Sequence, residues 1–410
     1  MDISLITRRN KKIDFFILLP TLALIGIGLA ALYSATHGAS VFLKFQKQAF
    51  WVVLGILLMV AVYFTSARFF HYSAYLVYTG ALLLLGAVLI FGESISGSVG
   101  WFGIGSYGVQ PSEFAKLATI LALARYLSDS TTSLQSIPDI LKSLLIVAVP
   151  WALILLQPDF GTGIVYWGIY LAMIFWAGAE MILLLTIVSP VIVAVLSILN
   201  IWWFLAAAVI IVGIFYISKR KLGLALMFLS VNLAVGFTVQ YAYEQLPEYQ
   251  RERVAVYLDP TRAPQTAGYN VLQSKVAIGS GGVTGRGYLE GSQTQLRFVP
   301  EQWTDFIYCV PAEEFGFIGA STILLLYLLL LLRGLYIARK LESRFSSLLV
   351  IGIVAMFAFH IFFNIGMTLG LIPVIGIPLP FMSYGGSFFL TSMLAIGLLL
   401  HAYSNLEYEA

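Results

Sequence analysis

Long apolar runs separated by short polar connections follow one another along almost the whole chain. Each run is ~16 to 24 residues long, which is the length of a helix that crosses a hydrocarbon core of ~30 Å, whereas the strands of an outer-membrane barrel are much shorter. The pattern predicts twelve membrane-spanning helices, at residues 13–34, 49–66, 73–92, 111–128, 142–157, 162–178, 181–199, 201–217, 222–241, 315–337, 346–366 and 384–403.

Basic residues near the connections predict the orientation of these spans. With the basic N-terminus in the cytoplasm, the basic connections at 219–221 and 333–344 also lie inside, as the positive-inside rule favours. Both termini are then cytoplasmic, and the long segment 242–314 lies outside. Merging two of the three closely joined spans in 181–241 would place the 219–221 cluster outside, so we keep three.

Composition supports the same fold class. With 60% hydrophobic and 10% charged residues, the chain lacks the charge that a soluble surface needs. We therefore expect an all-α polytopic membrane protein that forms a single domain over residues 1–410. The single cysteine, Cys309, excludes an intramolecular disulfide, and the four histidines show no metal-ligand spacing.

The outer segment 242–314 concentrates the charge. Residues 243–314 hold six basic and nine acidic side chains out of 43 charged residues in the chain. One interpretation is a solvated loop of mixed charge. Positive charge beside the outer membrane surface also suits an anionic group such as a phosphate, so this segment is the first place to look for chemistry.

Two ionisable residues fall inside or at the edge of the fourth span. Gln110 and Pro111 predict a helix start, which places Glu113 at the positive end of the helix dipole and Lys116 on the same face. A charge inside a span is a functional hypothesis by default, and we expect the pair to bind substrate. The alternative is an ion pair that only locks helices together.

Further polar groups are predicted on the outer side. Lys47, at the mouth of the second span, can hold an anion or simply anchor the helix at the interface. Asp159, between the fifth and sixth spans, can bind a ligand or cap the helix that follows. The secondary candidates for the site are Asp159 and, in the outer segment, Ser280 and Asp305.

Asp259 is the strongest candidate within the outer segment. It precedes Pro260, and a proline restricts the residue before it to extended backbone, so the carboxylate has few directions open. Among apolar neighbours, with Arg251 and Arg253 close by to hold phosphate oxygens, Asp259 is suited to abstract a proton. An ordinary turn aspartate before proline is the competing interpretation.

The glycine-rich stretch 277–287 reads AIGSGGVTGRG. It lacks the pattern of a phosphate-binding loop and of a dinucleotide fingerprint, so no nucleotide is expected, nor a haem or flavin. Its glycines permit close backbone approach to a ligand or to neighbouring helices. No alternation of basic and aromatic residues indicates nucleic acid.

Six motifs follow one another along the chain: QPSEFAK, QPDFGTG, YQRERVAVYLDP, GYNVLQSKVAIGSGGVTGRG, QTQLRFVPEQWTDFIYCVPAEEFGFIG and NIGMTLGLIPVIGIPLPFMSYGGS. Together they resemble the SEDS (shape, elongation, division, sporulation) family of bacterial cell-wall polymerases, in the family's order and over nearly the whole chain. The last two are more similar to the elongation branch than to the division branch.

The resemblance implies a peptidoglycan glycosyltransferase that polymerises lipid II on the outer face of the bacterial cytoplasmic (inner) membrane. It implies a class B penicillin-binding protein, the transpeptidase, and other membrane proteins of the elongation machinery as partners. A divalent cation, Mg²⁺ or Mn²⁺, is a candidate cofactor for the pyrophosphate that leaves.

The resemblance also implies residue roles. Asp259 matches the essential catalytic aspartate and would be the general base of an inverting transfer that releases undecaprenyl pyrophosphate. Glu113 and Lys116 match the family's PSExxK motif, and Arg251 and Arg253 match its QRxR motif.

The chain departs from the family pattern in two places. Lys47 stands where the family usually has arginine, which keeps the positive charge but loses bidentate phosphate binding. Elongation members usually have ten spans, so two of the three helices in 181–241 would be an inserted pair.

Two other classes of function remain open. A flippase that moves lipid II across the bilayer would depend on charges lining a path, and the Gly/Pro-broken segment 370–387 suits a transporter. A non-enzymatic scaffold of the elongation machinery would use the charged outer segment for docking and would tolerate the loss of the Asp259 carboxylate.

Overall fold

The computed structural model describes residues 12–38, 41–95, 98–104, 107–217, 222–245 and 268–409. By their contacts the residues form two compact units, one made of Met1–Ala177 with Tyr269–Ala410 and the other of Gly178–Gly268. Every range predicted to be a span holds a helix.

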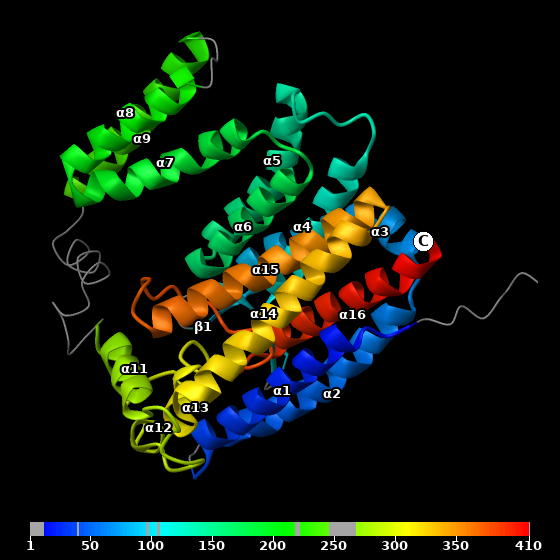
Figure 1. Cartoon of the computed structure of the whole chain (residues 1–410), viewed down its shortest axis with the longest axis vertical. Helices are drawn as coiled ribbons and strands as arrows, with labels where there is room; N and C mark the ends of the chain where they lie inside the picture. The colour runs from blue at the N-terminus through cyan, green and yellow to red at the C-terminus, as the bar shows by residue number, and fades with distance from the viewer. Residues whose placement is uncertain are drawn as a thin grey trace, which may run out of the picture. The chain divides into compact units, whose positions relative to one another are not determined.

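The larger unit is a helical bundle around α15. Its long helices are α1 (Phe15–Thr36), α2 (Leu43–Phe64), α3 (Ala67–Phe91), α4 (Pro111–Ser128), α5 (Ile137–Leu155), α6 (Phe160–Trp176), α14 (Gly316–Lys340), α15 (Arg344–Thr368) and α16 (Gly386–Glu409). In Figure 1, α2 runs along α16, and α15 packs against α4, α6 and α14. Because α15 is apolar on all sides, it is buried on nearly every face.

The outer helices of this unit present large apolar side chains to their surroundings. On α3, Leu76 and Ile90 are each 76% exposed, which a water-facing surface rarely tolerates over a whole helix. By length and composition, eight helices of the described part can cross a membrane. The predicted fold class, a polytopic helical membrane protein, is confirmed; the count of twelve crossings and the cytoplasmic termini stay predictions.

The smaller unit contains the three closely joined helices. They are α7 (Met181–Leu199), α8 (Ile201–Ile217) and α9 (Leu222–Gln245), and α7 packs against both α8 and α9. Three separate helices in 181–241 agree with the prediction from the sequence. Their interpretation as a family core helix plus an inserted pair stays a prediction.

A small antiparallel sheet between α3 and α4 was not predicted. It consists of β1 (Glu93–Ile95), β2 (Ser98–Ile104) and β3 (Tyr107–Val109), in that order. Glycine replaces side chains where the strands are crowded: a Cβ on Gly108 would lie 3.0 Å from the Trp101 ring. Since β3 ends directly before Gln110, the N-cap of α4, the sheet determines where α4 begins.

The described part of the outer segment folds into short helices. They are α11 (Tyr269–Ser280), α12 (Ser292–Gln295) and α13 (Cys309–Glu314). The glycine-rich stretch after α11 pairs with α13 and the start of α14, where Gly287 N donates to Glu314 O at 3.0 Å and Phe317 N to Gly282 O at 2.9 Å.

Glycines in this stretch serve backbone packing, the second of the two interpretations given above. A Cβ on Gly281 would lie 2.1 Å from Ala312 O, and one on Gly285 would lie 2.0 Å from Glu314 O. Gly285 also has φ +86°, in the left-handed region that residues with a side chain rarely adopt.

Gly285→Ala is therefore expected to lower the free energy of unfolding by roughly 1–3 kcal/mol, because it adds both backbone strain and a clash. Gly279→Ala is the matched control: Gly279 lies in α11 with no atom within 4 Å of its would-be Cβ, so alanine should be neutral or slightly stabilising. Thermal unfolding in detergent compares the two. Equal effects would contradict the packing role of Gly285.

Candidate active site

Glu113 and Lys116 form a buried ion pair at the start of α4. Pro111 takes the first helical position after Gln110, as predicted, and Lys116 Nζ lies 2.8 Å from Glu113 Oε2. Lys116 is 0% exposed and Glu113 is 2% exposed. Each of these buried charges compensates the other, because either one left unpaired in the apolar bundle would strongly destabilise the fold.

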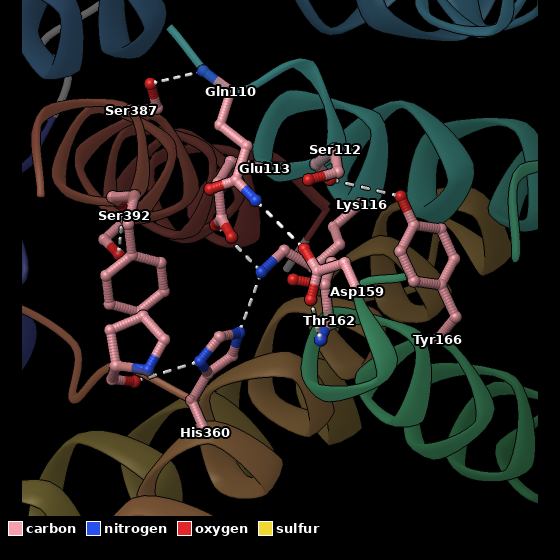
Figure 2. A network of polar contacts seen from close by, with 12 residues as sticks. Gln110, Ser112, Glu113, Lys116, Asp159, Thr162, Tyr166, His360, Ser387 and Ser392 are labelled. Carbon is pink, nitrogen blue, oxygen red and sulfur yellow. Dashed lines mark hydrogen bonds and ion pairs between the residues drawn. The ribbon is translucent and has the colours of Figure 1, made fainter. Parts of the chain in front are cut away.

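His360 of α15 is the second partner of the Lys116 ammonium. Its Nε2 lies 2.9 Å from Lys116 Nζ, and its Nδ1 lies 3.1 Å from Pro378 O (Figure 2). A carbonyl oxygen can only accept, so Nδ1 carries the proton and the bare Nε2 accepts from the ammonium. A doubly protonated ring would turn an N–H toward a cation, so the neutral ring is the form that fits.

His360 was not predicted as a site residue, because the spacing of the histidines indicated no metal site. The signal that identified Lys116, an ionisable residue inside an apolar helix, is nevertheless present at His360. That signal was available. The sequence does not reveal that the two side chains meet, since they are 244 positions apart.

Asp159 joins α6 to the same network. Its Oδ1 accepts from Thr162 N at 3.1 Å, so Asp159 caps α6. Its Oδ2 accepts from Gln110 Nε2 at 3.0 Å, and Gln110 N donates to Ser387 Oγ at 2.9 Å (Figure 2). The first turns of α4, α6 and α16 are thereby tied together beside the ion pair.

An irregular segment, residues 375–385, connects this network to the outer segment. Irregular backbone inside a helical bundle must have its polar groups satisfied by side chains. Three side chains donate to its carbonyl oxygens: Asn364 Nδ2 to Ile377 O at 2.8 Å, His360 Nδ1 to Pro378 O and Tyr327 OH to Pro380 O. Ser383 Oγ donates to Thr304 O at 2.6 Å, and Tyr384 N donates to Trp303 O at 2.9 Å. Because His360 contacts both Pro378 O and Lys116 Nζ, movement of the 375–385 segment would alter the surroundings of Lys116.

Lys47 lies within α2 rather than before it. The helix begins at Leu43, earlier than the predicted residue 49, and Lys47 is half-buried on its first turns. The neighbouring Gln48 is buried, and its Oε1 accepts from Gly385 N at 3.2 Å. Lys47 is thus placed one residue from a side chain that holds the 375–385 segment.

Ser280 and Asp305 lie in different surroundings of the outer segment. Ser280 Oγ donates to Glu313 Oε1 at 3.3 Å, and Glu313 also accepts from Thr294 N at 2.9 Å, so Ser280 helps to fasten this loop. Asp305 is half-buried between α12 and α13. Removal from water and the charge of Glu301 raise the pKa of Asp305 to about 6.

Three predicted site residues, Asp259, Arg251 and Arg253, lie outside the described residues. Their roles therefore stay predictions. What the structure brings together is Glu113, Lys116 and Asp159, with His360 as an additional member.

Comparisons with known proteins agree on one family. The profile of the FtsW, RodA and SpoVE family, described as cell cycle protein, matches residues 12–210 and 203–408. Peptidoglycan glycosyltransferase RodA of Treponema pallidum (strain Nichols) is 36% identical, over 96% of this chain and 98% of its own length. Peptidoglycan glycosyltransferase MrdB of Escherichia coli (strain K12) is 33% identical, over 97% of this chain and 96% of its own length.

A solved structure supports the same assignment. A chain from a structure on the coordination of polymerization and crosslinking by a peptidoglycan synthase complex superposes with a TM-score of 0.74 at 28% identity. The match covers 96% of this chain and 98% of that one. With profile matches that together span 12–408 and a relative 36% identical over nearly its full length, the chain belongs to the FtsW, RodA and SpoVE family, the SEDS family that its motifs resemble.

Proposed function

We propose that the chain is a peptidoglycan glycosyltransferase that polymerises lipid II into glycan strands during cell elongation. The observation that carries the proposal is its near-full-length likeness to the Treponema pallidum relative of that activity. The buried network of Glu113, Lys116 and His360 supports it, because ionisable groups held inside membrane helices usually serve a function.

The proposed reaction is an inverting glycosyl transfer. Asp259 takes the proton from the 4-hydroxyl of the acceptor's N-acetylglucosamine as that oxygen bonds to the anomeric carbon of the donor's N-acetylmuramic acid. The bond from this carbon to the pyrophosphate breaks on the opposite face, and undecaprenyl pyrophosphate leaves with the electron pair. The polyprenyl chain stays in lipid throughout.

Negative charge that develops on the leaving pyrophosphate calls for fixed positive charge. Arg251 and Arg253 are assigned this contact, and Lys47 is assigned a contact with substrate at the outer end of α2. Lys116, which is fully buried, acts in the described conformation by fixing α4 and the 375–385 segment relative to each other.

The candidate divalent cation has no ready site among the described residues. Among the residues that the structure describes, no three His, Cys, Asp or Glu side chains come together as a metal-binding group. No step of the reaction is therefore assigned to Mg²⁺ or Mn²⁺.

The proposed location is the bacterial inner membrane, with the active site on the outer face in segment 242–314 of one membrane domain. A class B penicillin-binding protein is the proposed partner, together with other membrane proteins of the elongation machinery. The structural relative from a peptidoglycan synthase complex supports a partner that crosslinks the new strand.

The test is polymerisation of purified lipid II by the purified protein in liposomes, with and without its transpeptidase partner. Glycan strands should form and should be digested by a muramidase. Movement of fluorescent lipid II between leaflets without any polymer, with the partner present, would instead favour the flippase. If neither polymer formation nor lipid II movement is observed, the scaffold role is the remaining hypothesis.

A further inference from the structure

Asp305 carries a carboxylate that receives no hydrogen bond from any side chain or N–H group in the described part of the chain. Its backbone is held firmly, since Asn364 Nδ2 donates to Asp305 O at 2.9 Å. Its Oδ2 lies 3.7 Å from the position that a Cβ would take on Gly376, whose φ is +69°. The Asp305 carboxylate therefore faces the 375–385 segment with its acceptor capacity unused.

The two neighbouring carboxylates of α13 behave differently. Glu313 accepts from Gln293 N at 2.8 Å and from Thr294 N and Oγ1 at 2.9 and 2.6 Å. Glu314 accepts from Ser34 Oγ and from Leu289 N, and these bonds oppose the rise in its pKa that burial causes. Both glutamates fasten loops to helices, and Asp305 has no such structural task for its side chain.

Keeping Asp305 ionised works against stability. Folding raises the pKa of Asp305 from 3.8 to about 6, first through desolvation and then through the charge of Glu301. A group whose pKa rises on folding contributes stability below its unfolded pKa, and this contribution is lost as pH rises through the folded value. At neutral pH the carboxylate is thus a destabilising feature, as is common for groups kept for function.

The side chain of Trp303, two residues before Asp305 in the chain, combines an aromatic ring with a cation held against it. The Lys44 ammonium lies 3.8 Å from the centre of the Trp303 ring and 5.8 Å from that of Tyr384. Trp303 is half-buried, and its buried Nε1 has no hydrogen-bond partner among the described residues. An unused indole donor and an unused carboxylate acceptor thus lie two residues apart.

We propose that Asp305 is a substrate-binding residue that accepts a hydrogen bond from a hydroxyl or acetamido N–H of the substrate's saccharide. The identity of this saccharide rests on the proposed function. An ionised carboxylate can only accept, so it suits a sugar and repels a phosphate. The indole N–H of Trp303, two residues before Asp305 in the chain, has no partner among the described residues and offers a donor to the same kind of ligand.

Binding to two matched ligands tests the proposal. Asp305→Asn should weaken binding of lipid II about tenfold or more, because a hydrogen bond to a charged acceptor is lost. Binding of undecaprenyl pyrophosphate, which has no sugar, should not change. Both are measured in proteoliposomes in an Asp259→Asn background, so that no turnover occurs. Glu290→Gln, at an exposed carboxylate of the same segment, is the control and should bind both ligands as before.

Thermal unfolding across pH separates this role from a structural one. Asp305→Asn should raise the midpoint at pH 7.5 by about 2 °C. The gain should shrink as pH falls below about 6 and vanish near pH 3.8, where the carboxyl is protonated in the unfolded chain as well. If the Asp305 side chain had a structural role, Asp305→Asn would instead lower the thermal unfolding midpoint. The sugar contact is wrong if Asp305→Asn weakens binding of lipid II and of undecaprenyl pyrophosphate equally. It is also wrong if extra Mg²⁺ restores the weakened binding.

The two proposals can fail separately. If the native protein makes no glycan but Asp305→Asn selectively weakens binding of lipid II, the sugar contact is supported and the polymerase function is rejected. If glycan forms and Asp305→Asn binds lipid II like the native protein, the polymerase stands and the role of Asp305 is wrong.

Discussion

Asp259→Asn is expected to abolish glycan synthesis while leaving the protein folded. The amide cannot take the proton of the attacking hydroxyl, and loss of a general base lowers rates by about 10²–10⁴-fold. The change is nearly isosteric, so packing should hardly be affected. The rate of polymer formation from lipid II, measured with the transpeptidase partner present, gives the result.

The control for this experiment is Glu248→Gln, which removes another carboxylate from the same segment. It should polymerise at close to the native rate. Both variants and the native protein are compared at matched thermal unfolding midpoints. Native-like synthesis by Asp259→Asn would discard Asp259 as the base, and it would do so without discarding the enzyme.

The helices were predictable because their signal is local. Pro111 after Gln110 marks the start of α4, and the predicted range 111–128 is the observed one. Ends were less predictable where polar residues extend a helix beyond the apolar core. α3 begins at Ala67 rather than 73 because Arg68 and His71, counted as connection, belong to its first turns.

The site was predictable only residue by residue. A charge in an apolar span identified Lys116, and a position before proline drew attention to Asp259. The sequence could not show that His360 accepts from Lys116 or that Asn364 holds the 375–385 segment, since such contacts join positions far apart in the chain. Local periodicity reports which face of a helix is apolar and carries no information about which helices meet.

Lys116→Met should be the most destabilising change at the site. It leaves the Glu113 carboxylate buried without its cation and His360 Nε2 without its donor. Breaking one side of a buried ion pair typically costs about 3–5 kcal/mol. We expect a large drop in the thermal unfolding midpoint of the purified protein in detergent, together with loss of polymerisation.

The double variant Glu113→Gln with Lys116→Met distinguishes function from mere helix locking. It removes both charges, so much of the stability should return, because replacing a buried pair is far less harmful than breaking it. If the pair serves catalysis through the 375–385 segment, polymerisation stays low in the refolded, stable double variant. If polymerisation returns along with stability, the pair only locks α4 in place and its functional assignment is wrong. Because stability and activity are measured on the same preparation, the two roles cannot be confused.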